Sequence, residues 1–349
     1  MRHREFNIEP ARSIAAPRQC AGRQGTDNLT ALQKTVEGFA SARVLLIGDT
    51  ILDIYTYGSA MGLSAETPTI VARRKEVKYS LGGAALVCRN LLELGAQVQF
   101  ITLVGSDEEA HHVRQFTAPG LNLLAVADPA RPTTVKHRFW VDGYKLFQLD
   151  QRDDQAISDE IARQVLAQVE RALPQTDLVV ISDYRHGLLS PGLLAQLLPR
   201  LRATGTPVYV DSQVSQTASN HKLYRDSDAV MVLNLKEARC VDPAFHPALN
   251  ADAFAVLNRE LGTSKIIVKL GSDGAMFQDG ANITQAPANK VTVTDTTGAG
   301  DAFLSAFCLA GTSDARSALQ LANAWAGLSV QIHGTIPPKK EDLLQLVKE

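Results

Sequence analysis

Cysteine is scarce in this sequence, and its cysteines do not occur in close pairs. The four residues, Cys20, Cys88, Cys240 and Cys308, lie far apart along 349 residues. This spacing excludes a zinc knuckle and a C-x-x-C redox motif. It fits a protein of a reducing compartment, in which most of these thiols are small core residues.

Net charge is also nearly absent. Lys and Arg together number 35 and Asp and Glu 37, which gives a formal net charge of -2. No global positive field exists to attract nucleic acid or an anionic membrane surface. An anionic ligand would therefore have to be held by local groups.

Long apolar runs are missing as well. No run approaches the roughly 20 residues that cross a bilayer, and the N-terminus lacks the apolar stretch of a secretion signal. Residues 1–26 mix Arg, Pro, Gly and Ala without a helical or strand period, which predicts a disordered tail. We find no internal repeat, and we expect a cytoplasmic protein.

What the sequence does contain is a regular alternation of strand and helix patterns from Asp27 to the end of the chain. Buried strands such as Val44 to Ile47 in "RVLLIGDTILDIY" alternate with helices such as "GGAALVCRNLLELGA". This rhythm predicts one α/β domain over residues 27–349, with a doubly wound, mostly parallel sheet flanked by helices. Two stretches of polar and apolar alternation, about 56–80 and 132–150, break the rhythm. They suit antiparallel strands and predict a small β-sheet lid over the mouth of the main sheet.

The stretch "TDTTGAGDAF", residues 294–303, lies between an alternating, strand-like run and an apolar run that predicts a helix from about Ala302. Gly298 and Gly300 permit close backbone approach, and the free amides of a helix start form a nest for an anion. A plain tight turn would need glycines too, and Asp301 would serve as a helix N-cap. A carboxylate fixed beside an anion nest is, however, also the general base that phosphoryl transfer to an alcohol requires.

With "LGGAALVCRNLLELG" and "DTTGAGDAF" in this order, the chain from about 42 to 340 resembles the ribokinase-like (PfkB-type) carbohydrate kinases. The resemblance implies an ATP-dependent sugar kinase that uses Mg²⁺, in a family where a monovalent cation such as K⁺ can activate. It assigns Gly298, Ala299 and Gly300 to the backbone anion hole for the transferred phosphoryl group. Asp301 would be the base that takes the proton from the sugar hydroxyl.

Two further motifs resemble the nucleotide side of that family. "LNLKEA" matches its N-x-x-E element, which implies that Glu237 contacts the metal, although N-x-x-E also occurs in ordinary helices. "VKLGSDGA" matches its nucleotide turn, which an ordinary hairpin could share. Asn323 lies where the family contacts the adenine or its flanking loop, and an ordinary position on a helix face explains it equally well. The implied nucleotide-site residues are Asn234, Glu237, Lys269, Gly271, Gly274, Thr296 and Asn323.

Within the family, the early segments look most like the kinases that act on D-glycero-D-manno-heptose 7-phosphate. The matching segments are "GDTILD", "LSAETPTIV", "LGGAA", "PTTVKHRF" and "SDYRHG". Paired carboxylates at a strand mouth accept hydrogen bonds from vicinal hydroxyls, and a substrate phosphate needs cations. The implied sugar-site residues are Asp49, Asp53, Gly82, Gly83, Lys136, Arg138, Asp183 and Tyr184, with Arg89 and Lys145 as further candidate cations.

The sequence departs from that pattern at three places. Leu86 stands where family members usually have Asn, His186 where the heptose kinases have Lys, and "VDSQ", with Ser212 and Gln213, where they have V-D-P-K. Two alternatives therefore stay open. The first is a kinase of the same family for another sugar, sugar phosphate or nucleoside, and the second is a non-catalytic sugar-phosphate sensor on a kinase scaffold.

The resemblance also bears on assembly and on the reaction sequence. The sequence shows no H-x-G-H motif of nucleotidyl transfer, so we expect the kinase step alone. Exposed strand edges in a lid seek partners, which predicts a homodimer through the lid.

Overall fold

The computed structural model describes residues 23–214 and 220–348. The predicted tail lies outside the described residues up to residue 22. Its last four residues do not belong to a tail, because helix α1 (Arg23–Gly38) begins at Arg23 instead of near Asp27. No proline interrupts residues 23–26, so the helix can extend toward the N-terminus.

The main sheet has nine strands in the order β13-β12-β11-β10-β9-β8-β1-β4-β5. All neighbours from β5 to β11 pair in parallel, and only the pairs β11–β12 and β12–β13 at one edge are antiparallel. This confirms the predicted mostly parallel sheet. The strands are β1 (Arg43–Gly48), β4 (Gln97–Val104), β5 (Leu121–Ala127), β8 (Leu178–Asp183), β9 (Val208–Ser212), β10 (Val230–Asn234), β11 (Lys265–Lys269), β12 (Ala275–Asp279) and β13 (Asn282–Ala286).

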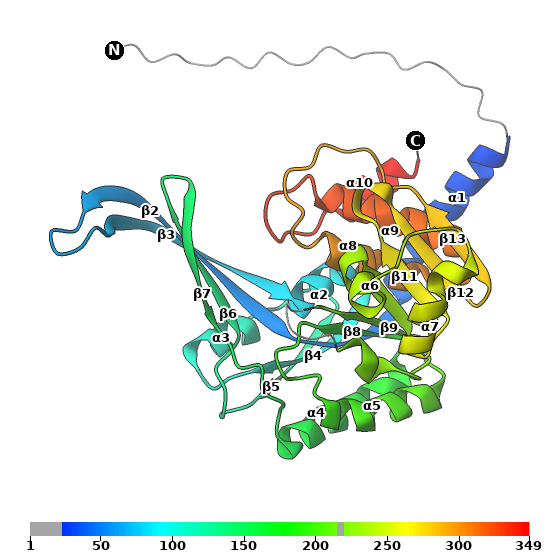
Figure 1. The fold of residues 1–349 in the computed structure, drawn as a ribbon, viewed down its shortest axis with the longest axis horizontal. Coiled ribbons are helices and arrows are strands. Elements are labelled where there is room, and N and C mark those ends of the chain that lie inside the picture. Colours follow the sequence, from blue (N-terminus) through cyan, green and yellow to red (C-terminus); the bar gives the residue numbers. More distant parts are fainter. Residues whose placement is uncertain (1–22, 215–219, 349) are drawn as a thin grey trace, which may run out of the picture.

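Helices cover both faces of this sheet (Figure 1). Strand β1 shows why: Val44 and Leu46 point into one apolar core, and Leu45 and Ile47 into the other. No helix within residues 23–214 and 220–348 is long and apolar enough to span a membrane. The first core is covered by α1, α2 (Ala84–Glu93), α8 (Ala299–Ala310), α9 (Ala315–Ser329) and α10 (Lys340–Leu346), and the second by α4 (Asp159–Ala172), α5 (Pro191–Thr204), α6 (Leu235–Val241) and α7 (Ala255–Leu261). The short helix α3 (Glu108–Arg114) lies against β5 and the lid.

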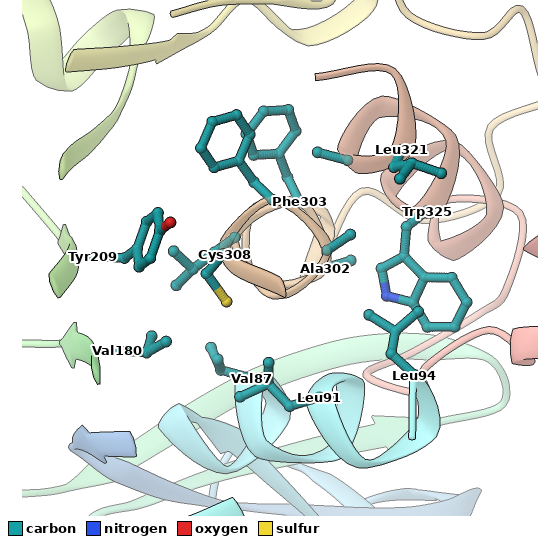
Figure 2. Close-up of a cluster of buried hydrophobic side chains, with 14 of the residues drawn as sticks. Val87, Leu91, Leu94, Val180, Tyr209, Ala302, Phe303, Cys308, Leu321 and Trp325 are labelled. Atoms are coloured by element: carbon teal, nitrogen blue, oxygen red, sulfur yellow. The ribbon is translucent and has the colours of Figure 1, made fainter. Parts of the chain in front are cut away.

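Helix α8 runs through the middle of the first core (Figure 2). Its residues from Ala302 to Cys308 are buried, so it is apolar on nearly all sides, as expected of a fully enclosed helix. Trp325 of α9 is completely buried beside it and donates its indole N–H to Asn90 Oδ1 of α2 at 2.8 Å. Packing on several sides therefore fixes where α8 begins.

A second sheet forms the predicted lid. Its order is β3-β2-β6-β7, and it projects from the main body (Figure 1). Its central pair, β2 with β6, is parallel, whereas the other two pairs are antiparallel as expected. Only Asp49 separates β1 from β2, so the lid grows directly out of the main sheet. Its strands are β2 (Thr50–Leu63), β3 (Ile70–Gly83), β6 (Val135–Val141) and β7 (Tyr144–Gln151).

The region before α8 differs from the prediction in two respects. Residues 287–293 are not a strand despite their alternation, because the chain turns away from the edge strand β13 where Asn323 Nδ2 donates to the carbonyls of Ala286 and Pro287. The chain instead crosses toward α9, where the amides of Thr294 and Asp295 donate to the carbonyl of Val330. Helix α8 then begins at Ala299, three residues before the predicted start, since Gly298 adopts the left-handed conformation (φ 82°) that ends the turn.

Candidate active site

A cleft of about 900 Å³ lies where the lid, the start of α8 and the nucleotide-side turn meet. The carboxyl ends of the parallel strands open toward this edge, where α/β sheets usually bind ligands. Sixteen of the predicted site residues line it. They are Asp53, Gly82, Gly83, Lys136, Arg138, Tyr184, Asn234, Lys269, Gly271, Gly274, Thr296, Gly298, Ala299, Gly300, Asp301 and Asn323.

The start of α8 forms one wall of the cleft. Gly298 is its N-cap and provides no capping side chain, and Leu86 packs so close to Gly298 that a Cβ there would collide with it. Amides of a first helical turn have no acceptor within the helix, and the helix dipole adds partial positive charge. This end of α8 is therefore suited to hold an anionic group.

Asp301 lies in the first turn of α8 and is not its N-cap. The phenol of Tyr184 donates to Asp301 Oδ1 at 2.8 Å. Burial raises the pKa of Asp301 to about 7, the Tyr184 hydrogen bond opposes this shift, and Asp211 adds to it. A carboxyl with a pKa near neutrality beside an anion nest has the properties of a general base.

A buried charge cluster lies behind the glycine turn. Lys269 Nζ contacts Asp211 Oδ2 at 2.6 Å, and Lys269 lies beside Gly300. Burial alone would lower the pKa of Lys269, but Asp211 and Glu237 raise it, so the lysine stays charged. The cluster thus places a fixed positive charge next to the start of α8.

Glu237 and Asn234 form a capping box at the start of α6. The amide of Asn234 donates to Glu237 Oε2 at 2.7 Å, and the amide of Glu237 donates to Asn234 Oδ1 at 2.9 Å. The N-x-x-E motif is therefore explained in part by helix capping. Glu237 is buried and does not line the cleft, and burial together with Asp211 raises its pKa to about 7.

No group of three or more His, Cys, Asp or Glu that could hold a metal ion occurs within residues 23–214 and 220–348, and the acidic side chains at this end of the cluster are Asp211 and Glu237. Asp211 Oδ1 is buried and has no hydrogen-bond partner, and its carboxylate lies near that of Glu237. Free carboxylate oxygens are the donors that Mg²⁺ prefers. Sequence reasoning missed Asp211, although an acidic residue at the end of a buried strand, as in "VYVDS", was a usable signal.

Two predicted sugar-site residues, Asp49 and Asp183, are not among the residues that line the cleft. Asp49 is buried and its Oδ2 accepts the amides of Tyr184 (2.9 Å) and His186 (3.3 Å). Asp183 is fully buried and its Oδ2 accepts hydrogen bonds from Ser212, Asn220 and Tyr224. Both carboxylates hold the loop that follows β8.

The lid supplies the charged residues of the cleft. Asp53 pairs with Arg138, and the Arg138 guanidinium lies over the ring of Tyr55. Lys136 lies 3.7 Å from Asp150. A Cβ at Gly82 would collide with the Asp53 carboxylate, which explains the glycine there.

The other two candidate cations lie elsewhere. Arg89 donates to the carbonyl of Thr335 at 2.8 Å, and Lys145 contacts Gln148 on the exposed strand β7. Neither lines the cleft.

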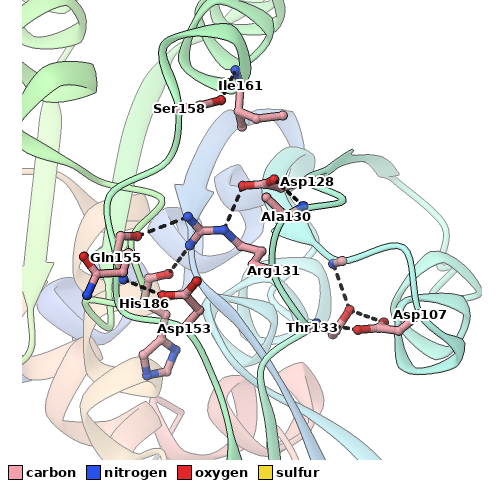
Figure 3. A network of polar contacts seen from close by, with 11 residues as sticks. Asp107, Asp128, Ala130, Arg131, Thr133, Asp153, Gln155, Ser158, Ile161 and His186 are labelled. Carbon is pink, nitrogen blue, oxygen red and sulfur yellow. Dashed lines mark hydrogen bonds and ion pairs between the residues drawn. The ribbon is translucent and has the colours of Figure 1, made fainter.

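A polar network ties the loop after β8 to the segment that enters the lid strand β6 (Figure 3). Arg131 pairs with Asp128 and donates to the carbonyls of His186 and Gln155. Thr133 is held in turn by Asp107. Burial lowers the pKa of His186 to about 4, so this residue is neutral near pH 7. His186 does not line the cleft, whereas Gln213 does.

The nucleotide-side wall rests on glycines and on Asn323. Gly274 has a φ of 92°, and a Cβ there would meet the backbone of residues 286–288. Asn323 Nδ2 donates to the carbonyls of Ala286 (3.0 Å) and Pro287 (3.1 Å). Its amide nitrogen thus holds the adjoining wall, residues 288–293, whose place in the cleft the sequence did not reveal.

The cleft thus brings together the lid, the uncapped start of α8 and the buried Asp301 carboxylate. The chain belongs to the pfkB family of carbohydrate kinases, whose model matches residues 41–342.

Similar proteins agree with this assignment. The bifunctional protein HldE of Paramagnetospirillum magneticum is 30% identical over 326 residues, covering 90% of this chain and 65% of that protein. HldE of Bradyrhizobium diazoefficiens is 33% identical over 317 residues, covering 87% and 62%. The chain therefore spans less than two thirds of the length of these relatives.

Solved structures share the fold. Arabidopsis thaliana ribokinase complexed with ribose and ATP superposes with a TM-score of 0.67 at 22% identity, covering 88% of this chain and 99% of that one. Escherichia coli phosphofructokinase-2 in complex with potassium gives a TM-score of 0.67 at 18% identity, covering 89% and 100%. The predicted ribokinase-like fold is confirmed.

Proposed function

We propose that this kinase phosphorylates the anomeric hydroxyl of D-glycero-D-manno-heptose 7-phosphate to give the 1,7-bisphosphate, a step toward ADP- or GDP-heptose. The observation that carries the proposal is the Asp301 carboxylate at the start of α8, in one cleft with the lid residues Asp53, Lys136 and Arg138. The heptose-kinase motifs of the sequence supply the choice of sugar.

The chemistry follows from the placement of these groups. Asp301 takes the proton of the anomeric hydroxyl as its oxygen attacks the γ-phosphorus of ATP, and the bond from that phosphorus to ADP breaks. The amides at Gly298–Gly300 and the charge of Lys269 stabilise the negative charge of the transferring group. Asp53 accepts sugar hydroxyls, and Lys136 and Arg138 attract the substrate's own phosphate.

Two cations belong to the proposal. Asp211 and Glu237 would hold Mg²⁺, which when bound neutralises phosphate charge. The potassium complex of the Escherichia coli relative supports activation by K⁺. Equal activity in potassium chloride and in choline chloride would argue against activation by K⁺.

The pH dependence of the reaction tests the role of Asp301. Because burial raises its pKa to about 7, the ionised base is lost as the pH falls through 7. We expect kcat/KM to fall about tenfold per pH unit below that point. The measurement is a pH–rate profile with saturating MgATP, and an acid limb near the usual aspartate value of about 4 would contradict the assignment.

The acceptor is tested by a panel of phosphorylated and free sugars with ATP. We expect the highest kcat/KM for the heptose 7-phosphate, and weaker use of the unphosphorylated heptose, since Lys136 and Arg138 then lose their ionic partner. A preference for an unphosphorylated hexose or a nucleoside would overturn the heptose assignment. Sugar binding without transfer to any acceptor would favour the sensor.

We also propose a homodimer formed through the lid. The lid exposes several large apolar side chains, and exposed apolar surface often marks an interaction site. One of them, Phe147, stacks on Phe139 with ring centroids 4.4 Å apart. A monomer in sedimentation experiments at micromolar concentration would refute it. The exposed apolar residues of the lid are Met61, Leu63, Ile70, Val71, Tyr79, Tyr144, Leu146, Phe147 and Leu149.

A further inference from the structure

The two oxygens of the Asp301 carboxylate have different surroundings. Oδ1 accepts the hydroxyl of Tyr184 at 2.8 Å. Oδ2 is the oxygen turned toward the glycine turn, 3.9 Å from the position that a Cβ of Gly298 would take. One oxygen is thus anchored while the other faces the anion nest.

The backbone of Tyr184 is held in place by a buried carboxylate. Its amide donates to Asp49 Oδ2 at 2.9 Å, and Arg185, which follows it, has a positive φ of 62°. A non-glycine residue in this conformation is costly unless its surroundings enforce it. The buried Asp49 carboxylate provides such an anchor, since it also accepts the amide of His186.

We propose that Tyr184 is a positioning residue for the catalytic base, holding Asp301 Oδ1 so that Oδ2 receives the proton of the acceptor hydroxyl, with Asp49 fixing Tyr184 in place. This inference rests on the proposed function, and it gives Asp49 and Tyr184 a role that differs from sugar binding.

The charged neighbours of Asp301 explain why an anchor is needed. Lys269 of β11 attracts its carboxylate and Asp211 of β9 repels it. Without the Tyr184 hydroxyl, the carboxylate is free to rotate toward Lys269, where neither oxygen would face the acceptor. Burial and the nearby Asp301 raise the pKa of Tyr184 far above its usual value, so its hydroxyl remains a donor.

The Tyr184→Phe variant tests the proposal by kinetics. Loss of one hydrogen bond to a charged group is expected to lower kcat about 10- to 100-fold, while KM for ATP stays within about twofold. The acid limb of kcat/KM is expected to move up by about one pH unit, because the ionised carboxylate loses a donor. The matched control is Tyr224→Phe, which removes a buried hydroxyl from another carboxylate, Asp183, and should leave the acid limb in place.

A second measurement does not depend on turnover. In the ligand-free protein, the ¹³C carboxyl signal of Asp301, assigned by its loss in Asp301→Asn, should titrate about one unit higher in Tyr184→Phe than in the wild type. An unchanged midpoint, or an equal shift in Tyr224→Phe, overturns the positioning role. If the wild type transfers phosphate to no acceptor, the proposed function fails, and this titration still decides the role of Tyr184.

Discussion

Replacing Asp301 by Asn is expected to lower kcat about 10²- to 10⁴-fold and to leave ATP affinity unchanged. The amide keeps the shape of the side chain and can still accept from Tyr184, but it cannot take up the proton of the acceptor. Steady-state ADP release and calorimetric titration with ATP measure the two quantities.

Although Asp301→Asn should lose activity, its folded state should not lose stability. The folded-state pKa of Asp301 is about 7 and its ordinary value 3.8, so above pH 7 the fold must bury a charge that the unfolded chain exposes to water. Asp301→Asn is therefore expected to be at least as stable as the wild type at pH 8. Asp314→Asn, at the N-cap of α9 and outside the cleft, serves as control and should keep turnover within about twofold. Near-normal turnover in Asp301→Asn would remove the base assignment.

Lys269→Met is expected to have the second large effect, because it acts on both catalysis and stability. Turnover should fall about 10²- to 10³-fold, since a fixed positive charge beside the anion hole is lost. The unfolding free energy should fall by about 3–5 kcal/mol, since Asp211 becomes an unpaired buried charge. Urea unfolding and ADP release provide the measurements.

A double variant tests the effect on stability, whereas its turnover has to be compared with that of Asp211→Asn alone, because Asp211 is also a proposed Mg²⁺ ligand. Asp211→Asn combined with Lys269→Met removes both charges, so most of the lost stability should return while turnover stays low. Recovery of turnover together with stability would show that Lys269 has only a structural role.

Local chemistry explains which features could be predicted from the sequence. Strand and helix patterns depend on neighbouring residues, so the mostly parallel sheet, its flanking helices and the lid were predictable in outline. The turn before α8 was predictable because Gly298 needs its left-handed conformation and Asp301 follows it three residues later, directly after Gly300. The glycines at 82 and 274 likewise reflect close approaches that any other residue would block.

The direction of a side chain was harder to predict. Asp49 follows β1, Asp53 lies near the start of β2 and Asp183 ends β8, yet of these three only Asp53 lines the cleft. The difference depends on backbone amides and hydroxyls that the fold brings from distant segments, such as Tyr224, and a single sequence does not show these. The wall at 288–293 was missed for a related reason, since its alternation suits a strand and only contacts with the distant helix α9 lead the chain away from the sheet.

The most direct test of the central claim is ³¹P NMR of wild-type protein and Asp301→Asn, each incubated with MgATP and D-glycero-D-manno-heptose 7-phosphate. We predict a new anomeric phosphate signal formed in equal amount with ADP by the wild type, and none by the variant over the same time. Inorganic phosphate in place of a sugar ester, or equal product from both proteins, would contradict phosphoryl transfer at this site.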